Sequence, residues 1–324
     1  MRSFMVRAGS EDAGHVPGLF EAEPGPHHLK LPISRGAHVS LCLVVLCWIA
    51  AAQPALACDR ECLRGTVTAY LYALLKHDTT KLPLADSVRV TEDGIEKPLA
   101  KVGILATVTS LRGYRQDILD ERAGVAGADV VVQESGAPLL LVVRIKVVGE
   151  KITEIETVST RTRAEGLSFN IDGLSAPSEE MNFVPRPAQL ATREKAIEIA
   201  LHYPQGLNAA DTFAAVDAPF TPDAYRLENG AVMAGAACTF TPTCKNISTQ
   251  SLAIFKRIGP VTTRLVAVDE RLGIVWLRMA WNVRADAPGK LTVWEAFKVY
   301  DGQIHAVEAF MRILPPELAN GGWN

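Results

Sequence analysis

Histidines are few outside the first 57 residues of this chain, where only His77, His202 and His305 remain. Histidine is the side chain most easily tuned to exchange protons near neutral pH, so each is a candidate acid or base. His202 and Tyr203 end a predicted helix, where the histidine could act as a base and the tyrosine hydroxyl could donate to a developing oxyanion. The alternative for this pair, and for His77, is a histidine favoured at a helix end by the helix dipole.

The last predicted strand carries His305 and Glu308, and both could take part in proton transfer. Side chains alternate between the faces of a strand, so these two point in opposite directions unless a bulge intervenes. Glu308 and Glu156, its counterpart in the repeat described below, both lie on apolar faces. A carboxyl that faces an apolar cavity has a raised pKa and could serve as a general acid or base. The alternatives are an exposed side chain or a structural ion pair with an arginine.

Three tryptophans, Trp276, Trp281 and Trp294, fall on predicted strands near the end of the chain, whereas residues 58–160 contain none. Aromatic side chains on a concave sheet suit flat apolar ligands, so we expect these three to line a substrate pocket. Core packing is the alternative for any one of them. The asymmetry favours the later part of the chain as the ligand-binding part.

Four cysteines follow residue 57, and their spacing predicts two short disulfide loops, Cys58–Cys62 and Cys238–Cys244. Four cysteines allow three pairings, and the close spacing favours the local one. The alternative is that the cysteines bind zinc. No C-x-x-C spacing occurs, so we expect no metal site.

The first 57 residues have the pattern of a secretory signal peptide. Lys30 and Arg35 precede an apolar run at residues 39–52, and small residues lead to a predicted cleavage site after Ala57. A membrane span needs about 20 apolar residues, so no span is expected and the chain is predicted to be secreted or periplasmic. Cleavage would leave Cys58 first, where lipid modification is the alternative fate. The part before Lys30 is longer than a signal needs, which indicates a start codon assigned too far upstream.

Composition and motifs exclude several classes of function. The formal net charge is −3 and no cluster of lysine and arginine occurs, which argues against a nucleic-acid partner. The chain contains no P-loop, G-x-G-x-x-G, H-E-x-x-H or G-x-S-x-G motif. Their absence argues against nucleotide cofactors, zincins and α/β-hydrolase chemistry, and we expect no cofactor.

A long internal repeat sets the domain organisation. Residues 120–124 read D-E-R-A-G and residues 269–273 read D-E-R-L-G, while residues 146–156 match residues 298–308. A period near 150 residues predicts two copies of one domain, each large enough to own a core. Each D-E-R-x-G segment lies between two predicted strands and ends in glycine, so we interpret it as a turn, not a catalytic triplet.

Each copy is predicted to begin with a helix and to continue as strands joined by hairpins, which gives an α+β fold. The helices are expected at residues 62–77 and 192–203, with Thr192 as an N-cap. We therefore expect a first domain at residues 58–160 (the first half) and a second at residues 190–316 (the second half). The leader at 1–57, a linker at 161–189 rich in glycine, serine and proline, and a tail at 317–324 complete the chain.

Both halves share an order of elements: a helix, a short strand with E-D-G at residues 92–94 or E-N-G at 228–230, and a final K-V-x-x-x-x-I-x-x-[IV]-E. The first half also has L-P-L at residues 82–84, before its short strand. This order resembles the SnoaL-like and ketosteroid-isomerase-like superfamily, also named after nuclear transport factor 2, in particular a secreted and largely uncharacterised branch. The resemblance implies two tandem cone-shaped α+β barrels, each with a helical front over a curved, mostly antiparallel sheet. It implies no specific reaction, because this fold serves enzymes and binding modules alike.

The function expected is that of a cofactor-independent lyase, isomerase or dehydratase outside the cytoplasm. It would act on a hydrophobic or aromatic small molecule by general acid/base catalysis. His202 and Tyr203 would stand at the pocket mouth, with Glu308 or His305 inside and the three tryptophans as walls. The alternative is a secreted module that binds a small molecule or a protein without turnover. A third interpretation is a structural pseudo-dimer formed within the chain by the two domains.

Overall fold

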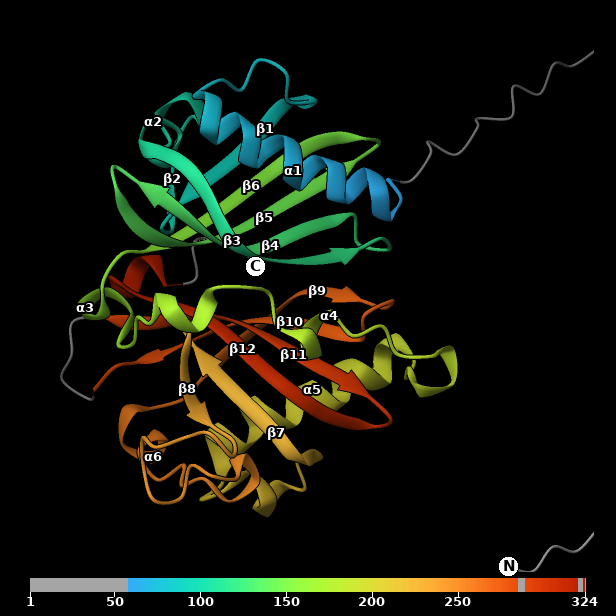
Figure 1. Cartoon of the computed structure of the whole chain (residues 1–324), viewed down its shortest axis with the longest axis vertical. Coiled ribbons are helices and arrows are strands. Elements are labelled where there is room, and N and C mark those ends of the chain that lie inside the picture. The colour runs from blue at the N-terminus through green and yellow to red at the C-terminus, as the bar shows by residue number, and fades with distance from the viewer. Residues whose placement is uncertain (1–57, 285–288, 320–322, 324) are drawn as a thin grey trace, which may run out of the picture. The chain divides into compact units, whose positions relative to one another are not determined.

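The computed structural model describes residues 58–284, 289–319 and 323, which fold around two six-stranded sheets (Figure 1). The predicted signal peptide and its cleavage site lie outside the described residues. Strands are joined mainly by hairpins and helices are few, so the predicted α+β class is confirmed. Within the described ranges, no helix is both long enough and apolar enough to cross a membrane.

The two sheets have the same strand order. The first runs β2-β1-β6-β5-β4-β3 and the second runs β8-β7-β12-β11-β10-β9. In each sheet one neighbouring pair is parallel, β1 with β6 and β7 with β12, and the other pairs are antiparallel. The bounds are β1 Leu84–Glu92, β2 Ile95–Glu96, β3 Val108–Asp120, β4 Val125–Glu134, β5 Ala137–Val148, β6 Lys151–Thr160, β7 Phe220–Glu228, β8 Ala231–Ala234, β9 Thr262–Asp269, β10 Ile274–Asn282, β11 Lys290–Tyr300 and β12 Gln303–Leu314.

Two long helices, α1 and α5, each pack on one sheet, and the remaining helices are short. The α-helices are α1 Arg60–Lys76, α2 Ile104–Thr107, α3 Arg163–Gly166, α4 Glu179–Asn182, α5 Arg193–Ala209 and α6 Phe255–Ile258. The 3-10 turns are η1 Leu99–Lys101, η2 Ile171–Leu174, η3 Pro187–Gln189, η4 Phe213–Val216, η5 Ile247–Thr249 and η6 Pro316–Leu318.

Side-chain caps fix where the two long helices begin. The Asp59 carboxylate accepts from the Cys62 N–H at 2.9 Å at the start of α1. The Thr192 hydroxyl accepts from the Lys195 N–H at 3.3 Å at the start of α5, which confirms the predicted N-cap. Each cap satisfies one of the backbone donors that a helix start leaves unpaired. Helix α1 ends at His77, whose backbone adopts the left-handed conformation at φ 54°.

Apolar residues form a core on both faces of each sheet. One face of the first sheet packs on α1, and one face of the second sheet packs on α5. The opposite faces of the two sheets share a third cluster, which includes Val131 and Val142 from the first half and Trp276 and Trp294 from the second. We call these opposite faces the joining faces. Because both faces of each sheet are buried, its central strands are apolar almost throughout.

The D-E-R-x-G segments form turns, as predicted. The aspartate of each turn also makes hydrogen bonds and an ion pair with the other half of the chain. Asp120 accepts from the backbone of β9 at 2.7 Å and pairs with Arg193, the first residue of α5, at 2.5 Å. Reciprocally, Asp269 accepts from the backbone of β3 at 3.1 Å and pairs with Arg60, the first residue of α1, at 2.7 Å. Both carboxylates are fully buried, so these are charge-assisted bonds screened little by water. We call the two sets of contacts the reciprocal clasps.

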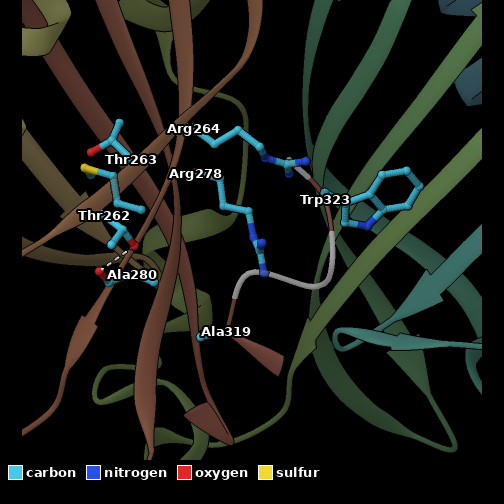
Figure 2. Close-up of a pocket in the computed structure, with 8 residues that line it drawn as sticks. Thr262, Thr263, Arg264, Arg278, Ala280, Ala319 and Trp323 are labelled. Carbon is cyan, nitrogen blue, oxygen red and sulfur yellow. Dashed lines mark hydrogen bonds between the residues drawn. The ribbon is translucent and has the colours of Figure 1, made fainter. Parts of the chain in front are cut away.

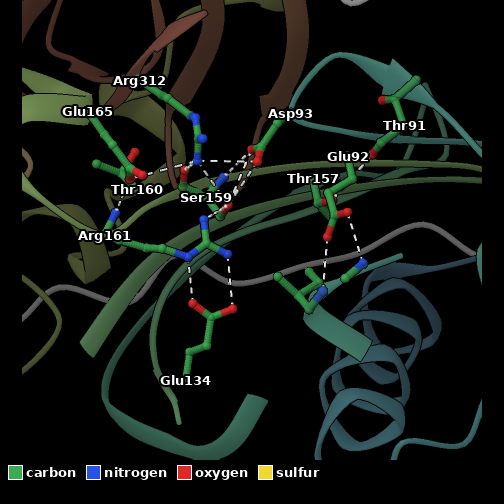
Figure 3. A network of polar contacts seen from close by, with 12 residues as sticks. Thr91, Glu92, Asp93, Glu134, Thr157, Ser159, Thr160, Arg161, Glu165 and Arg312 are labelled. Carbon is green, nitrogen blue, oxygen red and sulfur yellow. Dashed lines mark hydrogen bonds and ion pairs between the residues drawn. The ribbon is translucent and has the colours of Figure 1, made fainter. Parts of the chain in front are cut away.

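Residues 161–192 connect the halves and pack against the joining faces. Met181 and Leu174 are buried in the shared cluster. The ammonium of Lys298 donates to backbone carbonyls of this segment at Met181 and Phe183. At the end of β12, Arg312 pairs with Asp93 of the first half at 3.2 Å (Figure 3). The connecting segment therefore contributes side chains and carbonyls to the joining faces.

Candidate functional site

A cavity of about 450 Å³ opens on the face of the second sheet that carries α5. We call it the second-half pocket. Its wall is mostly apolar, with aromatic contacts such as the one between Phe255 and Trp281 at 5.6 Å. Four ionisable side chains stand among these apolar groups: Tyr203, Arg226, Glu228 and Glu295. A pocket that is mainly apolar, with a few converging polar groups, is the usual form of a small-molecule site.

Three secondary-structure elements bring the polar groups together. Tyr203 lies on the buried side of α5. Arg226 and Glu228 are two apart on β7 and Glu295 is on β11, so strand alternation turns all three toward the helix. Tyr203, Arg226 and Glu295 are buried, with exposed fractions of 3%, 7% and 2%.

The four groups form one connected cluster. Arg226 Nη1 donates to the Tyr203 hydroxyl at 3.0 Å, and that hydroxyl is also hydrogen-bonded to the Glu295 carboxyl. Arg226 Nε lies 2.9 Å from Glu228 Oε1, although its N–H is not aligned for a hydrogen bond. A ligand atom that entered the pocket would meet an arginine, a phenol and a carboxyl within one small region. We call this group of four side chains the polar cluster.

Burial makes Glu295 a proton-exchanging group near neutral pH. Loss of water around its carboxyl raises the pKa from 4.5 to about 8, with Arg226 opposing and Glu228 adding to the rise. Burial also raises the pKa of Tyr203 well above its ordinary value, although Arg226 opposes this. Arg226 remains charged, because Tyr203, Glu228 and Glu295 outweigh the effect of burial and raise its pKa. The cluster thus combines a fixed positive charge with a carboxyl that can hold or release a proton.

The first half offers an internal comparison, because strand register identifies equivalent positions. Arg226 pairs with Val307 as Val90 pairs with Ile155, so Val90 stands where Arg226 does. Glu295 pairs with Ala309 as Val143 pairs with Thr157, so Val143 stands where Glu295 does.

Both valines are buried in the core beneath α1. The fold is therefore complete without an arginine and a glutamate at these two positions, and only the second half has them. Buried ionisable side chains often give no more stability than apolar side chains of similar volume, so stability alone does not explain the presence of Arg226 and Glu295.

Two other members of the polar cluster have equivalents in the first half. Tyr70 stands eleven residues into α1, as Tyr203 does in α5. Glu92 stands where Glu228 does, but its carboxylate accepts from the N–H groups of Gly103 and Ile104 at 2.9 Å each (Figure 3). Burial acts to raise the pKa of Glu92, yet the bonds from Lys97 and these two N–H groups outweigh it and lower the pKa. In the first half this glutamate thus holds the start of a helix.

Of the residues predicted for the site, the structure places only Tyr203 and Trp281 in the second-half pocket. His202 points away from it and lines a shallow hollow on the outer side of α5, with Nδ1 3.0 Å from the Val216 carbonyl. The physical reason is helical geometry, because neighbouring residues point about 100° apart and cannot both face the sheet. His77, the other histidine at a helix end, lies 2.5 Å from the Leu105 carbonyl through Nδ1.

The strict alternation expected around His305 does not hold, because the register of β12 shifts between Ile304 and Ala306. His305 is the extra residue of this bulge, and it places Ile304 on the same face as Val307, toward α5. The His305 ring stacks on the Tyr300 ring, with the two ring centroids 3.4 Å apart. Burial lowers the pKa of His305, against the effect of the Tyr300 carbonyl.

Glu308 lies on the joining face, not in the pocket. Its two carboxyl oxygens accept from the hydroxyls of Tyr114 at 2.9 Å and Tyr225 at 2.8 Å. Burial raises the pKa of Glu308, and the two tyrosines oppose the rise. Its counterpart Glu156 is also on the joining face and pairs with Arg264 at 2.9 Å. The structural ion pair is therefore the outcome for Glu156, while Glu308 is buried between two phenols.

The three predicted tryptophans divide between the two faces of the second sheet. Trp276 and Trp294 are fully buried on the joining face, with their rings 4.9 Å apart. Trp276 fits against the first half at Gly127, where an added methyl carbon would stand 2.3 Å from the ring. Core packing thus accounts for these two, and Trp281 alone contacts the second-half pocket.

Both predicted disulfides are present, Cys58–Cys62 and Cys238–Cys244. The second closes a loop whose residues Phe240, Thr241 and Thr243 line the second-half pocket. Phe240 is 62% exposed at this edge. In the described part of the chain, no three histidine, cysteine, aspartate or glutamate side chains gather as a metal site would need.

We compared the chain with protein families, curated proteins and solved structures. A family model described as "Domain of unknown function (DUF8021)" matches residues 189–311. That range contains the whole polar cluster. No curated protein matches the chain. Among solved structures, a de novo designed protein with a curved β-sheet is similar over 40% of this chain and 97% of its own, at 16% identity and a TM-score of 0.28.

Proposed function

We propose that the second-half pocket is the active site of a cofactor-independent lyase, isomerase or dehydratase. Its substrate would be a hydrophobic or aromatic small molecule with one polar group. The observation that carries this proposal is the burial of Arg226 and Glu295 in an apolar pocket, at positions where the first half has Val90 and Val143. Perturbed carboxyls in such pockets are frequent in active sites.

In this proposal Glu295 transfers a proton to or from a substrate carbon or leaving group. A pKa of about 8 leaves the carboxyl able to change state near neutral pH, which is the condition for general acid/base catalysis. Arg226 and the Tyr203 hydroxyl would stabilise negative charge that develops on the substrate's polar group. The apolar wall would exclude water and bind the body of the molecule, with Trp281 and Phe255 offering ring faces.

We also propose that each half is a cone-shaped barrel of the SnoaL-like and ketosteroid-isomerase-like superfamily, and that the halves form an intrachain pseudo-dimer. The shared strand order and the long helix packed on each sheet support the first part. The reciprocal clasps support the second part, because each half uses equivalent residues to hold the other. The two disulfides support an oxidising compartment, as the proposed secretion requires.

Proton transfer by Glu295 can be tested on a panel of hydrophobic and aromatic carbonyl compounds in heavy water. The full chain is expected to exchange an acidic C–H for deuterium or to convert the compound, followed by nuclear magnetic resonance. Glu295→Gln should lower the rate by about 100-fold or more, since general acid/base groups contribute about that much. Glu308→Gln is the matched control, because it removes a buried carboxyl outside the pocket and should leave the rate unchanged.

A second variant separates catalysis from binding. The double variant Arg226→Val and Glu295→Val gives the second half the residue pair of the first, and it should fold but neither bind nor convert the compound. Compounds that bind the wild type and Glu295→Gln equally, without conversion of any, would favour the alternative of a binding module. Equal rates in the wild type and Glu295→Gln would refute the enzyme proposal.

A further inference from the structure

A second cavity, of about 250 Å³, lies beside the joining face of the second sheet (Figure 2), and none of its lining residues belongs to the polar cluster. Strands β9 and β10 supply Thr262, Arg264 and Arg278 to it. Trp323 forms another part of the wall. Its indole N–H donates to Thr91 at 2.9 Å and its ring lies under the Arg89 guanidinium at 4.0 Å, so it is held by the first half. We call this cavity the arginine cavity.

The carboxylate nearest to the arginine cavity, that of Glu156, is already paired with Arg264, one of the two arginines. Arg264 Nη2 donates to both carboxylate oxygens of Glu156, at 3.2 and 2.9 Å. Arg278 comes no nearer than 3.7 Å to that carboxylate, through Nε. The next arginine, Arg144, is paired with Glu154 at 2.8 Å. Two arginines thus share one carboxylate, and the pair leaves one positive charge in excess.

Arg278 is both buried and without hydrogen bonds on two of its nitrogens. Its side chain is 4% exposed, and neither Nε nor Nη2 has a hydrogen-bond partner. Burial lowers the pKa of Arg278 to about 10, with Glu156 opposing and Arg264 adding to the fall. A buried guanidinium with free donors is unfavourable unless an acceptor occupies the space in front of it.

The fold itself does not require an arginine at this position. Arg278 pairs with Trp294 and Arg264 in the second sheet, as Asp129 pairs with Val142 and Gln116 in the first. The first half therefore has an aspartate where the second has Arg278.

We propose that the arginine cavity is a binding site for a small oxyanion, such as a phosphate, sulfate or carboxylate group. The ligand would accept from Nε and Nη2 of Arg278, two parallel donors that match a pair of oxygens on one anion. One negative charge would balance the excess positive charge of the arginine pair. The cavity of about 250 Å³ has room for such an ion, since one water occupies about 30 Å³ of liquid.

Thermal unfolding of the full chain tests this site with inorganic phosphate, sulfate and acetate, each at constant ionic strength set with chloride. A bound anion stabilises the folded state by RT ln(1 + [anion]/Kd), so the unfolding midpoint should rise with the concentration of at least one of the three, and only logarithmically above Kd. Phosphate titration by calorimetry should give a stoichiometry of one per chain. The pattern across the three anions identifies the preferred source.

Arg278→Gln is expected to remove the part of the midpoint rise that comes from anion binding, together with the calorimetric signal. Arg122→Gln is the matched control, because Arg122 pairs with Glu270 at the surface and should leave the response intact. Salts also stabilise proteins by exclusion from the surface, but that effect does not depend on Arg278 and remains in both variants. Arg278→Lys keeps the charge without the paired donors, and it should weaken binding without abolishing it.

No rise in the unfolding midpoint of the wild type with any of the three anions would overturn the proposal. An equal response in the wild type and Arg278→Gln would overturn it as well. Neither result bears on the polar cluster, because this test measures no turnover and changes no residue of the second-half pocket.

Discussion

Replacing Glu295 by glutamine should remove a loss of stability that the wild type suffers as the pH rises. Burial raises the pKa of this carboxyl from 4.5 in the unfolded chain to about 8 in the folded chain. At a pH between these two pKa values, the carboxyl has released its proton in the unfolded chain but keeps it in the folded chain. The folded state then binds more protons than the unfolded state, so the free energy of unfolding falls with rising pH. At a pH below the lower pKa or above the upper pKa, this group does not change how the free energy of unfolding depends on pH.

The size of the effect follows from the same two pKa values. At about 1.4 kcal/mol for each pH unit, the interval corresponds to about 5 kcal/mol. The carboxyl is fully buried, so solvent screening takes little from this figure. Glutamine has nearly the same shape and can still accept from the Tyr203 hydroxyl, but it cannot ionise. Its free energy of unfolding should therefore lack this contribution at every pH.

Urea unfolding followed by tryptophan fluorescence, at several pH values between about 4.5 and about 9, measures the difference. The curve for Glu295→Gln minus the curve for the wild type should rise by up to about 5 kcal/mol and level off above pH 8. Glu194→Gln changes an exposed glutamate of α5 and should run parallel to the wild type. Parallel curves for the wild type and Glu295→Gln would refute the argument that this carboxyl is held protonated by burial.

Three further variants probe other parts of the structure. Asp269→Ala leaves the buried Arg60 guanidinium unpaired and should lower the free energy of unfolding by about 3 to 5 kcal/mol in urea, whereas a loss below about 1 kcal/mol would contradict the clasp. Gly127→Ala puts a methyl group 2.3 Å from the Trp276 ring and should cost about 1 to 3 kcal/mol in the same assay; an unchanged midpoint would contradict this contact. Phe240→Ala should leave stability unchanged within about 0.5 kcal/mol, because the ring is 62% exposed. It should weaken a pocket ligand about tenfold in calorimetry, and unchanged affinity would exclude the disulfide loop from binding.

The fold class was accessible from the sequence because its signals are local. The Thr192 cap, the D-E-R-x-G turns and the cysteine spacing each depend on a few neighbouring residues, and the structure has all three. The faces of the strands were not accessible in the same way. Glu308 and Trp294 were expected in a pocket, yet they lie between the two sheets. Apolar residues cover both faces of these strands, so alternation cannot tell which face meets the helix.

The polar cluster has a signal in the sequence that lies outside any short motif. Glu295 is a lone acid in an apolar strand, and the repeat places Val143 at the equivalent position. An ionisable residue in one copy at a position where the other copy has valine indicates a requirement beyond folding. The bulge at His305 left no such signal, because it depends on how β12 pairs with both of its neighbours.

The reciprocal clasps form only late in the synthesis of the chain. Arg60 is made early, but its partner Asp269 follows 209 residues later. At about 5 to 20 residues per second, the ribosome takes about 10 to 40 s to supply that carboxylate. During this interval the first half has a guanidinium without its acid and a joining face without its cover, including Val131 and Val142. The nascent first half is therefore the stage at which this protein would most need a chaperone.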